Sequence, residues 1–264
     1  MKGAGFLTHA AAGLLLAAAP AALGQSRPFL FTVTPSSEGA PQRWTVHYDA
    51  GYAERTTAPV SYDGMEQRIG VQGALGRGFT LIGQAGLGLG NGSASRTTEE
   101  VELLKDVTGR ERGLRLAVGL GLRREWEGAS VALGRVTLGR HFAASSLFGN
   151  LRFERAFSEG RDGVDFILTT GWLRRVGPGV HLGVEAVGED LEGLWEAEEA
   201  EGGAKVFVGP SLRVAPAGRP WALTLGGGPI LYASRSTPTS TAPRPLGGPG
   251  DNGYTVRLSL GYTF

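Results

Sequence analysis

Cysteine is absent from the 264 residues of the chain. This absence excludes a disulfide framework and a thiolate metal site, and it excludes a lipoprotein anchored through cysteine. Neither sign of charge dominates, because 26 Lys and Arg stand against 25 Asp and Glu and leave a formal net charge of +1. A balance of this kind gives no electrostatic reason to expect nucleic acid as a partner. Beyond residue 25, no apolar run approaches the ~20 residues of a membrane-spanning helix.

The N-terminus has the three parts of a secretory signal peptide. Lys2 supplies the positive charge, an apolar run follows over residues 10–19, and Pro20 ends it. Small residues precede Gln25, so we expect cleavage between Gly24 and Gln25. The sequence therefore predicts a signal peptide over residues 1–24 and one exported β-barrel domain over residues 25–264.

Glycine, by contrast, is abundant, with 44 residues in the chain, whereas roughly 7% is usual. Its spacing lacks the strict period of three that collagen requires. Several glycines, among them Gly83, Gly86 and Gly88, lie inside an apolar strand-like run. Glycines in such positions indicate closely packed or bent strands.

Segments of about ten residues with alternating polarity recur along the chain, which is the signature of a transmembrane barrel. In the last of them, the apolar or aromatic residues from Tyr254 to Phe264 share one face, and Thr255 and Arg257 lie on the other. The segments cover residues 43–52, 68–75, 79–89, 114–123, 129–139, 147–157, 165–172, 180–186, 205–214, 221–225 and 254–264. In the 129–139 segment the apolar parity shifts between Leu133 and Val136, which indicates a bulge.

Bacterial barrels of one chain have an even number of strands. We therefore take Phe29 to Thr34 as a twelfth strand, with ten strands as the alternative. This count conflicts with the rule of short periplasmic turns and longer external loops. Counted back from the C-terminus, residues 91–112 fall on the periplasmic side and the tight turn at 76–78 falls outside. At least one segment between residues 91 and 146 is therefore misassigned.

The predicted fold is an all-β, antiparallel, up-and-down transmembrane β-barrel of about twelve strands. A soluble β-sandwich is the alternative, since its strands also alternate. The export signal, the strand length and the aromatic ends of the strands favour the membrane barrel.

The final eleven residues, from Tyr254 to Phe264, resemble the terminal strand of bacterial outer-membrane proteins. The resemblance implies that the chain resides among outer-membrane lipids, and that Tyr254, Tyr262 and Phe264 form the signal read by the barrel-assembly machinery. It also implies periplasmic chaperones as partners during export. The stretch from Gly188 to Trp195, continued from Gly202 to Pro210, resembles a block of uncharacterised barrel families, with which no activity is associated.

Charged residues and one histidine occupy the positions expected to face the lumen. The candidates for lining it are Arg68, Arg115, Arg152, Glu154, Asp165, His181, Glu185, Lys205, Arg213 and Arg257, and Arg43, Asp49, Glu66 and Arg123 share the same expected face. Two functions fit them. The charges could line a porin-like channel for small solutes, or they could pair across the lumen and fill a closed structural or surface-binding barrel.

An enzyme is not expected, although barrel hydrolases are the third alternative. His181 and Glu185 lie on one face of a strand, but four residues of strand place them about 13 Å apart, too far to share a proton. His47 and His141 have no partner at a catalytic spacing. The acidic residues from Glu189 to Glu201 are expected to be a solvated loop, because they lack the spacing of a Ca²⁺ loop. We therefore expect no catalytic residue, no metal and no cofactor.

Overall fold

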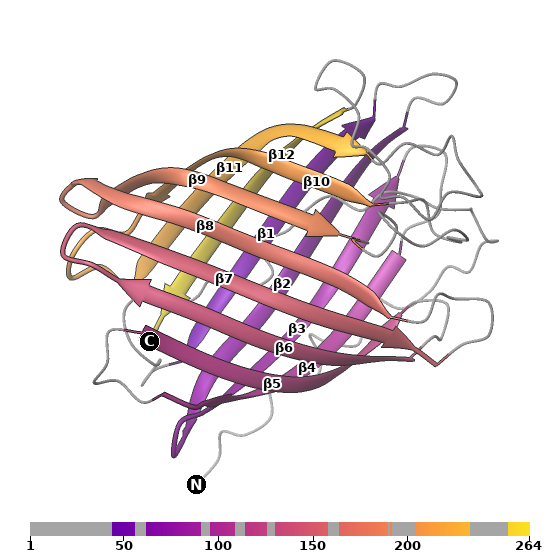
Figure 1. The fold of residues 1–264 in the computed structure, drawn as a ribbon, viewed down its shortest axis with the longest axis horizontal. Helices are drawn as coiled ribbons and strands as arrows, with labels where there is room; N and C mark the ends of the chain where they lie inside the picture. Colours follow the sequence, from indigo (N-terminus) through magenta and orange to yellow (C-terminus); the bar gives the residue numbers. More distant parts are fainter. Residues whose placement is uncertain are drawn as a thin grey trace, which may run out of the picture.

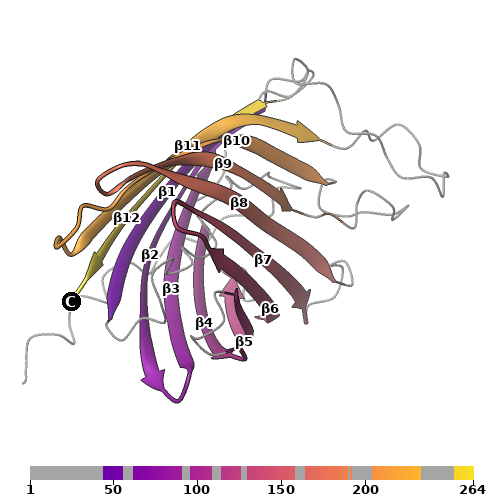
Figure 2. The ribbon, with the colours of Figure 1, turned by 60° about the vertical axis from the view of Figure 1, so that its left-hand side comes forward.

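A computed structural model describes residues 44–55, 62–90, 96–108, 114–125, 130–157, 164–189, 191, 204–232 and 253–264. Twelve antiparallel strands form one closed barrel, in which each strand pairs with its neighbours in the sequence and β1 pairs with β12. The strands run obliquely around the barrel (Figures 1 and 2). This architecture confirms the predicted fold class and the count of twelve.

The strands are β1 (Thr45–Arg55), β2 (Tyr62–Gly76), β3 (Phe79–Gly90), β4 (Arg96–Asp106), β5 (Leu114–Glu125), β6 (Ser130–His141), β7 (Ser145–Ala156), β8 (Asp165–Gly177), β9 (Val180–Glu189), β10 (Lys205–Val214), β11 (Trp221–Tyr232) and β12 (Gly253–Thr263). All eleven segments that alternate in the sequence correspond to one of these strands.

The twelfth strand is β4 and not the segment from Phe29 to Thr34. The barrel closes through β1 and β12 without that segment, which lies outside the described residues. Strand β4 runs through the middle of the stretch that sequence reasoning treated as one long connection, and it pairs along its length with β3 and β5. The conflict over residues 91–146 therefore had one cause, a missed strand.

With β4 in place, the tight turn at residues 77–78 lies at the end of the shorter connections, and the longest connections lie at the other end. The end that carries the C-terminus, here called the turn end, has the connections at residues 77–78, 107–113, 142–144, 178–179 and 215–220. The opposite end, here called the loop end, has those at residues 56–61, 91–95, 126–129, 157–164, 190–204 and 233–252. Figure 1 shows the turns between β6 and β7 and between β8 and β9 at the same end as the C-terminus. The tightest turn has Arg77 at a φ of 52°, between two glycines that also have positive φ.

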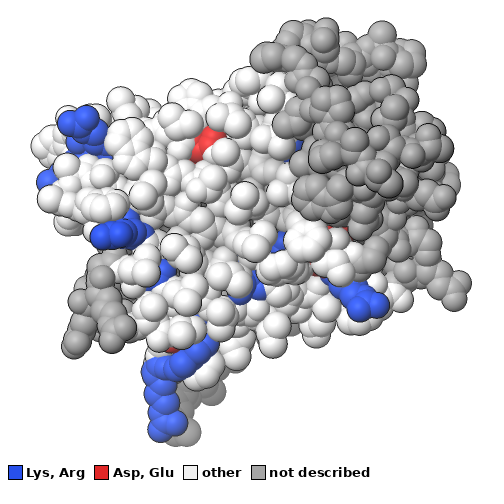
Figure 3. Space-filling model, in the orientation of Figure 1, with Lys and Arg blue, Asp and Glu red and all other residues white. Residues whose placement is uncertain are grey.

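The outer face of the barrel is apolar across its middle. Large exposed side chains there include Ile69, Val101, Leu120, Leu122 and Val256, and few charges interrupt the wall (Figure 3). Aromatic residues such as Trp44, Tyr262 and Phe264 lie near the turn end, as is common where a barrel meets the membrane interface. No helix within the described ranges is long and apolar enough to span a membrane.

Strand β6 has no bulge, contrary to the expectation from its sequence. Its pairing with β5 and with β7 runs without a register shift. Val131 and Leu133 are buried on the inner face, whereas Leu138 is exposed on the outer face. The apolar side chains therefore change from one face to the other along a regular strand.

The ladder between β10 and β11 is incomplete over residues 208–210. Phe207 pairs with Ile230 and Ser211 pairs with Gly226, but the residues between these rungs are not paired in register. Pro210 lies in this gap and has no N–H to donate. Opposite it, the backbone oxygen of Gly227 lies 2.0 Å from the position that a Cβ on Gly209 would take, so the two backbones approach closely.

Candidate functional site in the barrel lumen

The inner face of the barrel is largely polar, apart from inward apolar side chains such as the buried cluster of Ala53, Val187, Phe207 and Ile230. The predicted lumen candidates on β2, β7, β9, β10 and β12 alternate inward with their strands, and so do Arg115 on β5 and Asp165 at the start of β8. Arg43 lies outside the described residues. Most of the inward charges near mid-height are buried, including Arg152, Glu154, Glu185 and Arg257.

Three arginines and four glutamates on neighbouring strands form what we call the β4–β7 cluster. It consists of Glu100 and Glu102 on β4, Arg123 and Glu125 on β5, Arg135 on β6, and Arg152 and Glu154 on β7. All seven residues are buried. Charges removed from water in this way require direct partners, because the loss of hydration costs several kcal/mol per ion.

Each arginine of the cluster has those partners. Arg123 donates to Glu154 at 2.7 Å and to Glu125 at 2.8 Å. Arg152 lies 2.9 Å from Glu154 through its Nε and also pairs with Glu100. Arg135 pairs with Glu102. The cluster is therefore a continuous network of ion pairs.

The pair of Arg152 and Glu100 joins β7 to β4, with β5 and β6 between them. Neighbouring strands are ~4.8 Å apart, so the backbones of β4 and β7 are separated by roughly 14 Å along the wall. The two side chains therefore meet over the lumen and not along the wall. The cluster is a bridge inside the barrel that extends from the middle of β6, at Arg135, to the loop end of β5, at Glu125.

A second set of contacts, the β9–β12 cluster, bridges the opposite part of the lumen. Arg257 on β12 pairs with Glu185 on β9, again three strands away. Ser211 on β10 donates to the same carboxylate at 3.1 Å, and the Arg257 guanidinium lies 4.5 Å from the centre of the Phe207 ring. Arg257 is 0% exposed, so the lumen is not open to solvent beside it.

The remaining inward charges form local pairs closer to the strand ends. Arg68 donates to Glu66 on the same strand at 2.9 Å. Lys205 lies 2.9 Å from Glu189, and Arg115 lies 3.2 Å from Asp106. Each of these pairs joins one positive and one negative side chain, so together they add no net charge to the lumen.

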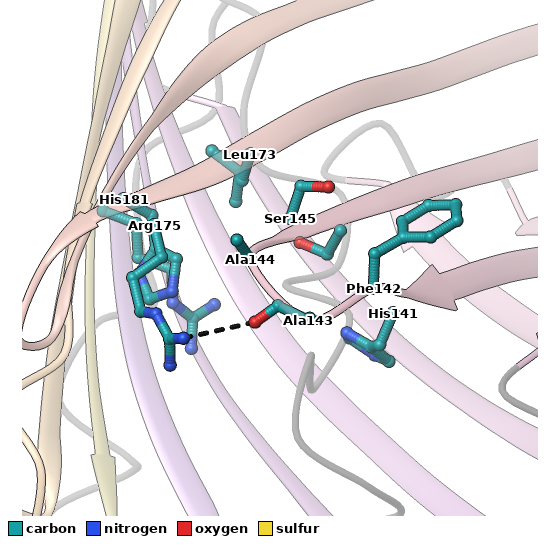
Figure 4. A pocket seen from close by; sticks show the side chains of 10 residues that line it. His141, Phe142, Ala143, Ala144, Ser145, Leu173, Arg175 and His181 are labelled. Carbon is teal, nitrogen blue, oxygen red and sulfur yellow. Dashed lines mark hydrogen bonds between the residues drawn. The ribbon is translucent and has the colours of Figure 1, made fainter.

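At the turn end the inner face is different. A pocket of about 130 Å³ lies there, and the side chains that line it include His141, Ser145, Arg175, His181 and Arg213. Figure 4 shows His181 and Arg175 close together beside the β6–β7 turn. Arg175 donates to the backbone oxygen of Ala143 at 3.2 Å. This pocket is a mouth lined by basic groups, below the bridged part of the lumen.

Sequence reasoning missed four residues of the β4–β7 cluster. Glu125 was missed because the predicted segment ended at residue 123, two residues before the end of β5. Glu100 and Glu102 were missed with their strand. Arg135 was missed because the apolar residues Val131 and Leu133 precede it on the inner face. A count of connection lengths was the signal that could have found β4, because only an extra strand there restores the order of short and long connections.

The three histidines His47, His141 and His181 lie on three different strands, β1, β6 and β9. His181 and Glu185 share the inner face of β9, as their spacing predicts, but Glu185 is engaged by Ser211 and Arg257. His47 lies 3.5 Å from Asp49 on the same strand, and His141 ends β6 at the pocket. In the part of the chain that the structure describes, no group of three or more acidic or histidine side chains could hold a metal ion. The acidic loop after Glu189 lies almost wholly outside that part.

The residues of the expected assembly signal lie on the outer face of β12. Tyr254, Tyr262 and Phe264 are all exposed there, and the Phe264 amide donates to the Trp44 backbone oxygen at 3.0 Å. Their role in assembly stays a prediction.

A closed barrel with a polar, charge-paired lumen and an apolar outer wall is the fold of bacterial outer-membrane barrels. Three solved structures share it with this chain. An outer membrane channel from Pseudomonas putida F1 matches with a TM-score of 0.56 and 10% identity, over 88% of this chain and 99% of that one. The NanC porin matches with a TM-score of 0.54 and 8% identity, over 82% of this chain and 100% of that one. The KdgM porin matches with a TM-score of 0.51 and 11% identity, over 83% of this chain and 99% of that one. No protein-family model matches the chain, and neither does any curated protein.

Proposed function

We propose that the chain is a porin-like channel of the outer membrane that passes small hydrophilic solutes, with the β4–β7 cluster as its constriction. The observation that carries the proposal is the bridge from Arg152 to Glu100 across the lumen. A barrel built only as a scaffold could fill this space with apolar side chains, which often stabilise as well as a buried ion pair or better. Charged side chains, in contrast, can exchange a partner for water or for a passing ion.

The narrowness of the constriction limits the solute. The cluster residues are buried and paired, so a solute must separate ion pairs to pass. We therefore expect small ions to pass in preference to sugars or peptides. The three similar structures carry the names of porins and a channel, which agrees with transport, although their low identity speaks for the fold alone.

The test is conductance in planar bilayers. A charge-neutral variant, Glu100→Ala/Arg123→Ala/Arg152→Ala/Glu154→Ala, removes two acids and two bases from the constriction. We expect its single-channel conductance to be severalfold larger than that of the wild type, because the lumen widens without a change in net charge.

The matched control is Glu99→Ala/Arg124→Ala. These residues oppose each other on β4 and β5, but they point outward, so conductance should equal that of the wild type. If the four-residue variant folds and conducts no more than the wild type, the cluster is not the constriction.

The closed structural barrel is the second candidate, and the complete burial of Arg257 favours it. This candidate predicts no conductance from folded wild-type protein. If the folded wild type shows no conductance and the four-residue variant conducts, the chain is a closed structural barrel.

A further inference from the structure

The outside of the barrel carries charge of one sign at the turn end. In the described turns and the four strand residues next to each, the Lys and Arg side chains that do not face the lumen are Arg77, Lys105, Arg140, Arg174 and Arg219. The one acidic residue in the same set, Asp106, faces the lumen and lies 3.2 Å from Arg115. Several blue side chains are visible at this end of the surface (Figure 3). The outer rim at the turn end is therefore basic.

The loop end of the same wall has both signs of charge. Glu99 on β4 points outward and is directly opposite Arg124 on β5. Arg155 on β7 is exposed on the same face. Within the described residues, an excess of positive charge is therefore a feature of the turn end and not of the wall as a whole.

Two of the cations at the turn end lie beside aromatic side chains. The Arg140 guanidinium lies 5.1 Å from the centre of the Phe142 ring. Trp172 precedes Arg174 by two residues of β8, so both side chains are on the outer face, where both are exposed. Aromatic residues gather where a barrel meets the lipid headgroups. Arg140 and Arg174 are therefore at the depth where lipid phosphates are expected.

Arg140 and Arg174, here called the outer basic pair, flank strand β7. Arg140 is directly opposite Leu147, and Arg174 is directly opposite Ser145. Two strand spacings of ~4.8 Å, combined with two residues of ~3.3 Å along β7, place the two backbones roughly 12 Å apart. Both side chains are exposed, and two extended arginines can reach one headgroup across that distance.

We propose that the outer basic pair docks the headgroup of an anionic phospholipid in the leaflet at the turn end. The planar guanidinium fork matches phosphate oxygens, and basic residues at a membrane surface are attracted to anionic lipids. Leu147 and Leu182 are exposed beside the pair and offer an apolar surface to the acyl chains. The docking surface goes beyond the proposed channel, because it lies on the outside of the barrel.

The experiment measures quenching of tryptophan fluorescence by brominated lipid. The full chain is reconstituted in phosphatidylcholine vesicles that contain either dibrominated phosphatidylglycerol or dibrominated phosphatidylcholine, and Trp172→Phe identifies the quenching that arises at the site. We expect the wild type to prefer phosphatidylglycerol roughly fivefold or more, since one basic residue near an anionic surface contributes about that much. Arg140→Gln/Arg174→Gln should lose most of this preference. Heat-modifiable migration on a gel verifies folding, and if the double variant does not fold, Arg174→Gln alone should still lower the preference.

The matched control is Arg124→Gln/Arg155→Gln, which removes two outward arginines from the loop end and should keep the preference of the wild type. Equal loss in this control would show diffuse attraction to a basic protein and would overturn the proposal. An unaltered preference in the turn-end variant, or equal quenching of the wild type by the two lipids, would also overturn it. So would loss of the preference when inorganic phosphate is added at constant ionic strength, since the pair would then be a general anion site. Conductance plays no part in this assay, so a wild type that binds the lipid but does not conduct would reject only the channel.

Discussion

Arginine has opposite surroundings in two regions of this lumen. Between the middle of the barrel and the loop end, Arg123, Arg135 and Arg152 are buried among four glutamates and bridge strands two or three positions apart. At the turn end, Arg175 and Arg213 lie in an open pocket that has no described acidic lining. The same side chain is therefore buried in a network of ion pairs in one region and lines a solvent-accessible pocket in the other.

A loss of about 3–5 kcal/mol in the free energy of unfolding is the largest effect we expect, and it follows from Arg152→Ala. Removal of this arginine leaves Glu100 and Glu154 buried without one of their cations, which is the costly way to break a buried pair. Urea unfolding in phospholipid vesicles measures the change. Arg155→Ala on the same strand, at an exposed outward position, should change stability by no more than about 0.5 kcal/mol. Similar losses in both variants would remove the distinction between cluster and surface.

The next largest loss in the free energy of unfolding should come from an arginine introduced on the lipid-facing side of the wall. Leu120 on β5 is 75% exposed on the outer wall, and Leu120→Arg should cost about 2–4 kcal/mol if that position lies at the bilayer midplane. Leu114, on the same face at the turn end, is 39% exposed. Leu114→Arg should cost only about 0–1 kcal/mol, because charge near the interface is tolerated. The same vesicle unfolding assay compares them, and equal costs would contradict the assigned depth of the barrel.

The smallest effect should come from Arg213→Ala in the pocket. Its side chain is partly exposed and Arg213 is directly opposite His181 on β9, so we expect the free energy of unfolding to change by no more than about 1 kcal/mol. The free energy of unfolding of Arg213→Ala, measured without phosphate or other oxyanions, is compared with that of Arg152→Ala. A loss as large as that of Arg152→Ala would mean that both regions are structural.

Strand β4 shows why most of the wall could be predicted from sequence and one part could not. A membrane strand is recognised in a sequence by its apolar outer face. Strand β4 has Glu99 and Lys105 on that face, and it has charged residues on the inner face as well. Leu103 and Leu104 are adjacent, which breaks the alternation further. Nothing local distinguishes such a segment from a polar connection, and only its pairing with β3 and β5 does so.

The inward positions of the charges followed from alternation, but their partners did not. Glu185 and Arg257 are 72 residues apart and meet only because the barrel closes and its strands tilt. The row of Arg175, His181 and Arg213 depends in the same way on the registers between β8, β9 and β10. Register is a property of the assembled sheet, and the sequence of a single strand carries little of it.

The incomplete ladder between β10 and β11 determines where the closed sheet would open under mechanical load. Where the first and last strands meet, every residue from Thr45 to Arg55 has a partner in β12. The rungs around Pro210 are missing instead. Under mechanical load we expect β10 and β11 to separate there first, while β11, β12 and β1 stay paired with one another.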